Sequence, residues 1–443
     1  MALSGLEIYK LLPKTNCRKC GFPTCLAFAM QLAKKAVSLD QCPFLTPETK
    51  KILEESSLPP IRLITIKRED NTLEIGNESV MFRHEEKFYH PTGIGIILND
   101  DLSDGQLNEI LEMVKKLEFE RVGQRLKIDL LAIRNRSMPE RFLEVVEYVI
   151  KNTTLPLVYM SENPSILRQA LKISPAGSSL IYRATAKNFM EFAQLSKDYK
   201  TPLVVSADNL EELSNLTKQF NQQEIEDLVL EVKSDSAAIC LWQLTQIRRL
   251  ALKKKERSLG YPCLVVVETK DKDLDALFAT TYIAKYAGIV LLDLFQPEEI
   301  LSILTLRQNI YTDPQRPLQI EPKLYPVGNA KDDSFVLVTT NFSLTYYTVL
   351  GEVEASKVPA YILSVNTEGM SVLTAWAAEK FTANTITEAI HKHNLKEIIS
   401  RHRLIIPGYV AILSGDLEDK SGWQVIVGPK EAAGIPAFLK NLS

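Results

Sequence analysis

The chain has 443 residues, of which 45% are hydrophobic, and a formal net charge of −3 at pH 7. This length and composition predict about three domains with large cores, and the nearly balanced charge gives no electrostatic case for nucleic-acid binding. No apolar run approaches the roughly 20 residues of a membrane span, and none near the start suits a signal peptide, so we expect a cytoplasmic protein without membrane or nucleic-acid partners.

Four of the six cysteines lie close together near the start, in the spacing C-x2-C-x4-C-x16-C: Cys17, Cys20, Cys25 and Cys42. Thiols grouped in this way hold an iron–sulfur cluster, a zinc ion or disulfides. Zinc sites usually have a second C-x2-C pair or nearby histidines, whereas the first histidine here is His84, and disulfides suit secreted chains. The spacing, with Pro43 after the last cysteine, therefore favours one 4Fe-4S cluster, while zinc and reduced structural thiols remain alternatives.

The segment after the third cysteine is predicted to be helical. Thr24 is a suitable N-cap, and an apolar stripe follows at Leu26, Met30, Ala33 and Val37. A proline-bearing connector is expected at about 45–60. The two remaining cysteines, Cys240 and Cys263, have apolar neighbours and are interpreted as ordinary buried residues.

Residues 61–90 are predicted to form a strand pair, at 61–68 and 79–84. Short β-branched and leucine-rich runs then alternate with amphipathic helices as far as about residue 310. The strands are expected at 93–98, 128–133, 157–160, 179–182, 203–206, 228–232, 264–267 and 288–292. Eight apolar strands, each followed by a helix, predict a (β/α)8 TIM barrel, with a doubly wound sheet as the alternative.

Residues 311–330 contain four prolines and are predicted to be a linker. A small open α/β sheet is expected to follow, with strands at 335–340, 360–365, 404–406, 409–413 and 424–427, a helix over 370–381 and a last helix starting near Glu431. In such sheets ligands bind at the carboxyl ends of the strands.

The expected strand-to-helix loops of this sheet are rich in small and hydroxyl residues, at 339–341, 366–374 and 428–434. They predict a cradle for a large cofactor, although such residues also simply cap helices. No G-x-G-x-x-G or P-loop motif supports nucleotide binding. No histidine completes a D-x-H-x-x-G motif.

At the barrel mouth the nearest polar candidates are expected to cap helices or face a partner: Asn99, Asp100, Glu162 and Glu268.

The order of these parts resembles one known family over the entire chain, the large (gamma) subunit of the corrinoid iron–sulfur protein of the acetyl-CoA (Wood–Ljungdahl) pathway. The most specific motifs are the cysteine segment 17–42 and the run 369–376, GMSVLTAW. The resemblance implies an iron–sulfur cluster domain at 1–58, a TIM barrel at 59–315 and a corrinoid-binding α/β domain at 316–443.

The resemblance also implies a corrinoid and a 4Fe-4S cluster as cofactors. The four early cysteines would bind the cluster, and the corrinoid contacts would be Thr340, Tyr346, Gly369, Met370, Ser371, Val372, Leu373, Thr374 and Ala433. A carrier that cycles through nucleophilic Co(I) prefers few axial ligands, so the missing histidine motif fits a base-off corrinoid without a protein histidine. The cluster would reactivate Co(II) by returning an electron.

The implied function is a corrinoid-dependent methyl carrier between methyltetrahydrofolate and acetyl-CoA synthase. Implied partners are a small corrinoid-protein subunit in a heterodimer, a methyltetrahydrofolate methyltransferase, acetyl-CoA synthase and an activator ATPase or ferredoxin. No catalytic residue is predicted, and whether the chain counts as an enzyme outside its complex stays open. The alternatives are a ferredoxin-like electron-transfer subunit and a TIM-barrel methyltransferase.

Overall fold

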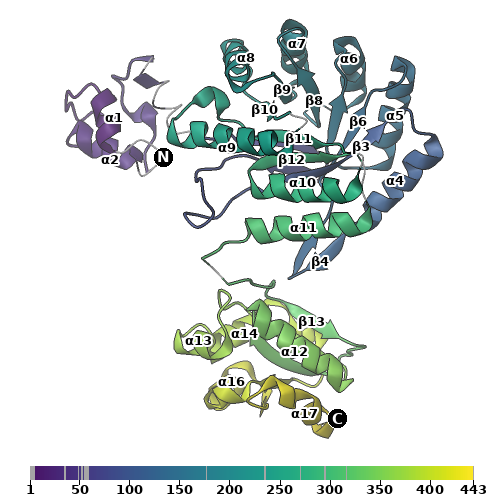
Figure 1. Ribbon diagram of the computed structural model, residues 1–443. Coiled ribbons are helices and arrows are strands. Elements are labelled where there is room, and N and C mark those ends of the chain that lie inside the picture. Colours follow the sequence, from purple (N-terminus) through teal and green to yellow (C-terminus); the bar gives the residue numbers. More distant parts are fainter. Residues whose placement is uncertain are drawn as a thin grey trace. The chain divides into compact units, whose positions relative to one another are not determined.

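The computed structural model describes residues 5–33, 36–47, 49–50, 53, 59–175, 177–233, 236–269, 271–293, 296–315 and 317–442. The chain divides into two compact units (Figure 1). One unit spans residues 1–118 and 127–311, and the other spans 119–126 and 312–443. Much of the predicted connector at 45–60, with the boundary at residue 58, lies outside the described residues.

The cysteine segment forms a small helical structure with its own apolar core. It contains α1 (Gly5–Leu11), α2 (Cys25–Ala33) and the 3-10 helix η1 (Leu39–Gln41). Thr24 caps α2 as predicted, since its Oγ1 accepts the Ala27 N–H at 3.1 Å. The predicted helix was too long at its end, because Val37 is not helical.

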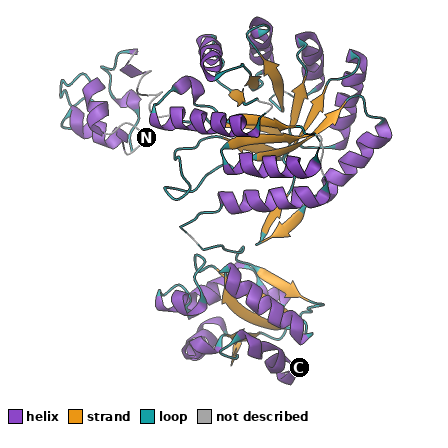
Figure 2. Cartoon of the chain, in the orientation of Figure 1, coloured by secondary structure: helices purple, strands orange, loops and turns teal. Residues whose placement is uncertain are grey.

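The predicted barrel is confirmed, and the doubly wound alternative is wrong. Eight strands among the described residues close in the order β10-β11-β12-β3-β6-β7-β8-β9, and all neighbouring pairs are parallel. Figure 2 shows these strands at the centre, surrounded by helices. The strands are β3 (Gly93–Asn99), β6 (Leu130–Arg134), β7 (Leu157–Met160), β8 (Ser179–Ala184), β9 (Leu203–Val205), β10 (Leu228–Glu231), β11 (Cys263–Val267) and β12 (Ala287–Leu292).

Each barrel strand leads to one outer helix. In chain order these helices are α4 (Asp104–Lys116), α5 (Pro139–Asn152), α6 (Pro164–Ile173), α7 (Phe189–Tyr199), α8 (Leu210–Gln222), α9 (Ala237–Lys253), α10 (Lys272–Ala284) and α11 (Pro297–Tyr311). A short 3-10 turn, η2 (Arg257–Leu259), follows α9. Because every strand is enclosed by helices, its residues are apolar almost without interruption.

A hairpin of β1 (Ile64–Arg68) and β2 (Asn71–Ile75) closes the amino-terminal end of the barrel. Its buried residues join the barrel core, and Leu73 lies directly against Gly93 at the start of β3. The strand predicted at 79–84 is wrong. Its backbone bends instead, because Glu85 accepts the N–H groups of Met81 and Phe82, each at 3.1 Å.

The second unit is the predicted small open sheet, in the order β13-β15-β14-β16-β17. Only β13 runs antiparallel to its neighbour. The strands are β13 (Leu324–Val327), β14 (Phe335–Thr340), β15 (Ala360–Val365), β16 (Arg403–Ile406) and β17 (Gln424–Val427). A further hairpin, β4 (Phe119–Arg121) and β5 (Gln124–Leu126), also belongs to this unit.

Helices cover both faces of this sheet. One face packs against α12 (Ser343–Ser356) and α17 (Ile435–Leu442), with the short η4 (Ala432–Gly434) beside them. The other packs against α13 (Val372–Ala377), α14 (Ala383–Lys392), α15 (Leu395–Ile398), η3 (Gly408–Leu413) and α16 (Ser414–Ser421). The chain passes from β14 to β15 on one side and then returns to β16 on the other, so β14 is a topological switch point.

Three predictions for this unit were wrong in detail. The linker contains the strand β13, because an edge strand that pairs only with β15 tolerates Pro326. The strand predicted at 409–413 is the 3-10 helix η3, a reminder that short apolar runs do not distinguish helix from strand. The helix predicted over 370–381 is limited to α13.

Candidate functional site

The four early cysteines share one short segment. Cys17 and Cys20 precede α2, Cys25 is its first residue, and Cys42 follows η1. Cys25 is buried, Cys20 and Cys42 are half-buried and Cys17 is exposed. All six cysteines of the chain are described, and none forms a disulfide.

The loop that carries these thiols is held by Asn16. Its Oδ1 accepts the N–H of Cys25 at 2.8 Å, and its own N–H donates to the Cys25 Sγ at 3.4 Å. Gly21 adopts a positive φ of 86° in the same loop. A hydrogen bond from the Lys19 backbone lowers the pKa of the Cys17 thiol, which favours the thiolate that binds metals.

The donor set fits an iron–sulfur cluster, with four free thiols and a backbone N–H group directed at one sulfur. In the part of the chain that the structure describes, however, no three histidine, cysteine, aspartate or glutamate side chains are gathered closely enough to hold one metal ion. Three of the thiols contact one small core.

The carboxyl ends of β14, β15, β16 and β17 meet at one edge of the C-terminal sheet, and the predicted corrinoid contacts lie on or near the loops at this edge. Thr340, Tyr346 and Gly369 are buried, whereas Met370, Ser371 and Val372 are half-buried. The exposed members are Leu373, Thr374 and Ala433.

Two features of this edge suit a large ligand with both polar and apolar surface. The Thr340 hydroxyl is fully buried at the end of β14 but has no hydrogen-bond partner, and such a group normally has one. Large apolar side chains are also exposed on α13 and η3, which contact each other. We call these four residues the apolar rim: Leu373, Trp376, Tyr409 and Ile412.

The sequence predicts only part of the apolar rim. Leu373 and Trp376 lie in the run 369–376 that it singles out, whereas it predicts a strand at 409–413, where the structure has η3. Ile412 is 77% exposed in the structure. The loop 428–430 was predicted correctly to lie at this edge. Gly408 packs against it so closely that a Cβ atom would lie 2.6 Å from the Gly428 carbonyl oxygen.

Asn341 is the polar residue of this edge that sequence reasoning left out of the site. The sequence predicts it to lie in a loop, but its side chain is buried and hydrogen-bonded to the loop after β15. An asparagine directly after a strand is a common loop residue, so its spacing alone carried no signal.

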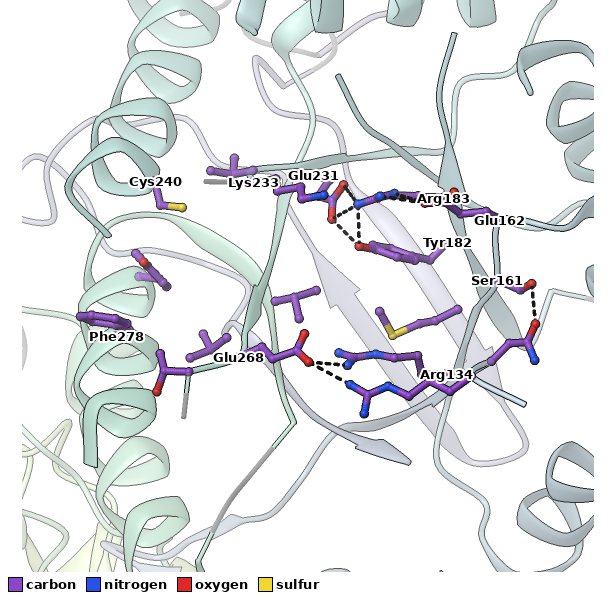
Figure 3. A pocket seen from close by; sticks show the side chains of 18 of the residues that line it. Arg134, Ser161, Glu162, Tyr182, Arg183, Glu231, Lys233, Cys240, Glu268 and Phe278 are labelled. Atoms are coloured by element: carbon purple, nitrogen blue, oxygen red, sulfur yellow. Dashed lines mark hydrogen bonds and ion pairs between the residues drawn. The ribbon is translucent and has the colours of Figure 1, made fainter. Parts of the chain in front are cut away.

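A separate cavity of about 720 Å³ lies at the carboxyl ends of the barrel strands (Figure 3). Arg134 and Arg136 both bind Glu268, at 3.0 and 2.9 Å. Arg183 binds Glu162 at 2.7 Å and Glu231 at 3.0 Å.

Each carboxylate among the described residues that line this cavity is thus paired with an arginine. Burial, and then the neighbouring Glu231, raise the pKa of Tyr182, so its hydroxyl stays protonated and donates to Glu231. The described lining residues therefore offer no free carboxylate to act as a general base.

Of the four polar residues expected at the mouth, Glu162 and Glu268 line the cavity, while Asn99 and Asp100 do not. Asp100 is fully buried and accepts the N–H groups of Arg136 and Ser137, at 2.7 and 2.8 Å. It thereby orders the loop before α5, close to the expected capping role.

Comparison with known proteins places the chain in a family. A family model described as the CO dehydrogenase/acetyl-CoA synthase delta subunit matches residues 63–439, and a second model, whose description names an Fe-S cluster, matches residues 12–44. The protein belongs to the family of corrinoid/iron-sulfur protein large subunits, also called acetyl-CoA decarbonylase/synthase gamma subunits.

Two relatives document this membership. The corrinoid/iron-sulfur protein large subunit of Moorella thermoacetica is 44% identical over 99% of both chains. The acetyl-CoA decarbonylase/synthase complex subunit gamma of Methanocaldococcus jannaschii is 35% identical over 99% of this chain and 96% of its own.

Among solved structures, 7,8-dihydropteroate synthase from Vibrio fischeri ES114 is similar with a TM-score of 0.39 and 14% identity, covering 56% of this chain and 97% of its own.

None of the described helices combines the length and apolar character that a membrane span requires.

Proposed function

We propose that this chain is the corrinoid-binding subunit of a methyl-carrying complex of the acetyl-CoA pathway. When bound, the corrinoid would supply the chemistry, taking a methyl group from methyltetrahydrofolate at Co(I) and giving it to acetyl-CoA synthase, while a 4Fe-4S cluster would return an electron to Co(II). The observation that carries the proposal is the edge of the C-terminal sheet at the switch point β14, where the buried Thr340 hydroxyl lacks a partner and the apolar rim is exposed.

The chain's own residues would bind and orient the cofactor. Because Thr340 and Tyr346 are buried, part of the ligand must enter between the loops to reach them. Ser371 and Thr374, whose hydroxyl oxygens lie 3.0 Å apart, would offer polar contacts nearer the surface. The other proposed contacts are Gly369, Met370, Val372, Leu373 and Ala433.

The histidines of the C-terminal unit support a corrinoid without a protein axial ligand from this unit. His391 and His393 lie at the end of α14, and His402 directly precedes β16. The connection from β15 to the parallel strand β16 must return to the amino ends of the strands, so these residues fall at the edge opposite the proposed site. Electron paramagnetic resonance of the Co(II) form should show no hyperfine coupling to a histidine nitrogen.

The cluster would be bound by Cys17, Cys20, Cys25 and Cys42. The proposed partners are the small subunit as heterodimer partner, a methyltetrahydrofolate methyltransferase, acetyl-CoA synthase and an activator ATPase or ferredoxin. The Methanocaldococcus relative is named as a subunit of an acetyl-CoA decarbonylase/synthase complex, which supports such an assembly.

Metal analysis of the anaerobically purified complex tests the proposal. We expect about four iron atoms and one cobalt atom per copy of this chain. Replacing Ser371 and Thr374 together by phenylalanine should lower the cobalt content and leave iron unchanged. A native complex without cobalt would contradict the function, and unchanged cobalt in the double variant would place the site in another loop.

The role of the cluster is tested separately with Cys20→Ala. This variant should lose the intact cluster, seen as loss of its visible absorption and of iron, because one of four ligands is missing. Methyl transfer from chemically pre-reduced protein should stay close to the wild-type rate. If that transfer is also lost, the cluster does more than reactivate cobalt.

A further inference from the structure

Asn341, the first residue after β14, is a buried hydrogen-bonding centre. Asn341 is only 1% exposed, and its side chain connects three segments of the C-terminal unit. Its Oδ1 accepts the Thr367 N–H at 2.9 Å, the Thr367 hydroxyl at 3.1 Å and the Gly369 N–H at 3.1 Å. Its Nδ2 donates to Gln319 at 3.0 Å and to Asn366 at 3.4 Å.

The loop that Asn341 holds contains a turn that needs support. Glu368 and Gly369 have positive φ angles of 56° and 76°, and the Met370 N–H donates to the Thr367 carbonyl across them at 3.2 Å. Glutamate adopts a left-handed conformation only at a cost, so such a turn persists where surrounding contacts determine it. Here two backbone N–H groups of the turn are bound by one amide oxygen.

The third segment is the chain that enters the unit before β13. Gln319 forms an isolated antiparallel bridge with Phe342, and the Ile320 N–H donates to the Asn341 carbonyl at 3.0 Å. The aliphatic part of Gln319 also lies under Gly369, where a Cβ atom would come within 2.7 Å of its Cγ. The entering chain, the end of β14 and the loop after β15 are therefore held together around one side chain.

We infer that Asn341 is a positioning residue for the corrinoid. It would hold the loop 366–371 in the conformation in which Gly369, Met370 and Ser371 meet the ligand, without touching the ligand itself. The inference rests on the proposed function, because it presumes that this loop contacts a corrinoid. An amide oxygen that satisfies both N–H groups of the turn fixes the loop before the ligand arrives, which lowers the entropy lost on binding.

Three variants of the full chain, produced with its small subunit, test the inference. Asn341→Leu removes the acceptor and keeps the branched arrangement of four side-chain heavy atoms. Asn341→Asp keeps an acceptor for Thr367 and Gly369, and the amides of Gln319 and Asn366 can turn to donate to the carboxylate. Thr339→Val is the matched control, since Thr339 is an equally buried neighbour whose hydroxyl has no partner and whose side chain faces away from that of Thr340.

The first measurement is amide hydrogen exchange of a peptide covering residues 366–372 in corrinoid-free protein. We expect exchange about tenfold faster in Asn341→Leu and close to wild type in the other two variants. The second measurement is cobalt retained by the complex after gel filtration. Retention should fall clearly in Asn341→Leu and be restored in Asn341→Asp.

The outcomes separate the inference from the proposed function. Wild-type complex without cobalt overturns both. Wild-type complex with cobalt, together with unchanged loop exchange or unchanged cobalt in Asn341→Leu, overturns the inference alone. If Asn341→Leu does not fold, Gln319→Ala takes its place, and it should speed exchange of the same peptide while the barrel peptides keep their protection; no change in that variant also overturns the inference.

Discussion

Gly369 occupies a backbone conformation that leaves no room for a side chain. Its φ is 76°, and a Cβ atom would lie 2.7 Å from the Gln319 Cγ and 3.1 Å from the Pro317 carbonyl oxygen. We expect Gly369→Ala to destabilise the C-terminal unit by about 1–3 kcal/mol, because the strained φ and the contact add. The temperature of thermal unfolding and the cobalt content of the complex should both fall.

Gly351 provides the matched control for this change. It is an exposed residue within α12, and nothing lies within 4 Å of a Cβ atom built there. Gly351→Ala should therefore stabilise the unit by roughly 0.5–1 kcal/mol, because alanine loses less backbone freedom in a helix. A loss of stability at Gly351 equal to that at Gly369 would contradict the argument from φ and space.

Residues of the candidate site differ in how well the sequence predicts them. The four cysteines stand out by spacing, and the loop 366–374 by its place directly after a predicted strand. Thr340 was predicted through the family resemblance, but its lack of a hydrogen-bond partner is a tertiary fact. Asn341 and Gln319 are 22 positions apart, and nothing in either local sequence indicates that their amides meet.

The hairpin β4–β5 is an element whose sequence position is misleading. It lies between a barrel helix and a barrel strand, yet it belongs to the C-terminal unit. Val122 at its tip packs against the core that contains Ile320, and a Cβ atom on Gly123 would lie 3.0 Å from the Glu321 nitrogen. Val122 has a φ of 54°, which is rare for a β-branched residue, and its packing against the core around Ile320 compensates for that conformation.

Replacing residues 119–126 by eight glycine and serine residues tests this contribution. We expect the C-terminal unit to lose about 1–3 kcal/mol, because apolar surface near Ile320 is uncovered. Hydrogen exchange of peptides around residue 320 should accelerate, while peptides from the barrel strands stay protected. The milder Val122→Ala should give a smaller loss, and unchanged exchange in both would contradict the assignment.

At the level of elements, periodicity predicted best where an element is regular and fully buried. All eight barrel strands were found within a few residues, since parallel strands enclosed by helices are continuous apolar runs. The elements that were missed depend on partners elsewhere. Strand β13 contains Pro326 and is a strand because it pairs antiparallel with β15, which comes later in the chain. The polar β2 is a strand because it pairs with β1, and its apolar residues cover the end of the barrel.

For the molecule as a whole, buried tyrosines predict loss of barrel stability in alkali. Burial raises the pKa of Tyr159 and of Tyr311 to about 12, from an ordinary value of 10.0. As pH rises above 10, the unfolded chain therefore loses these protons first. The stability that both groups contribute is complete below pH 10 and is lost as pH approaches 12.

Urea unfolding of the barrel at pH 9, 10 and 11 measures this effect. We expect the free energy of unfolding to fall by roughly 1 kcal/mol per tyrosine between pH 10 and 11. The double variant Tyr159→Phe and Tyr311→Phe should show a flatter dependence. An equally steep fall in that variant would assign the alkaline loss to other groups.

The division of the chain into 1–58, 59–315 and 316–443 stays a prediction. The sequence by itself determined the cysteine segment, the eightfold alternation of strand and helix and the small open sheet, because spacing and hydrophobic period are local properties that survive in a linear chain. The tertiary structure alone decided that the hairpin 119–126 packs with the C-terminal unit, that arginines pair with Glu162, Glu231 and Glu268 in the barrel cavity, and that Asn341 holds the loop after β15. These features join residues far apart in the sequence, and only folding brings their side chains within hydrogen-bonding distance.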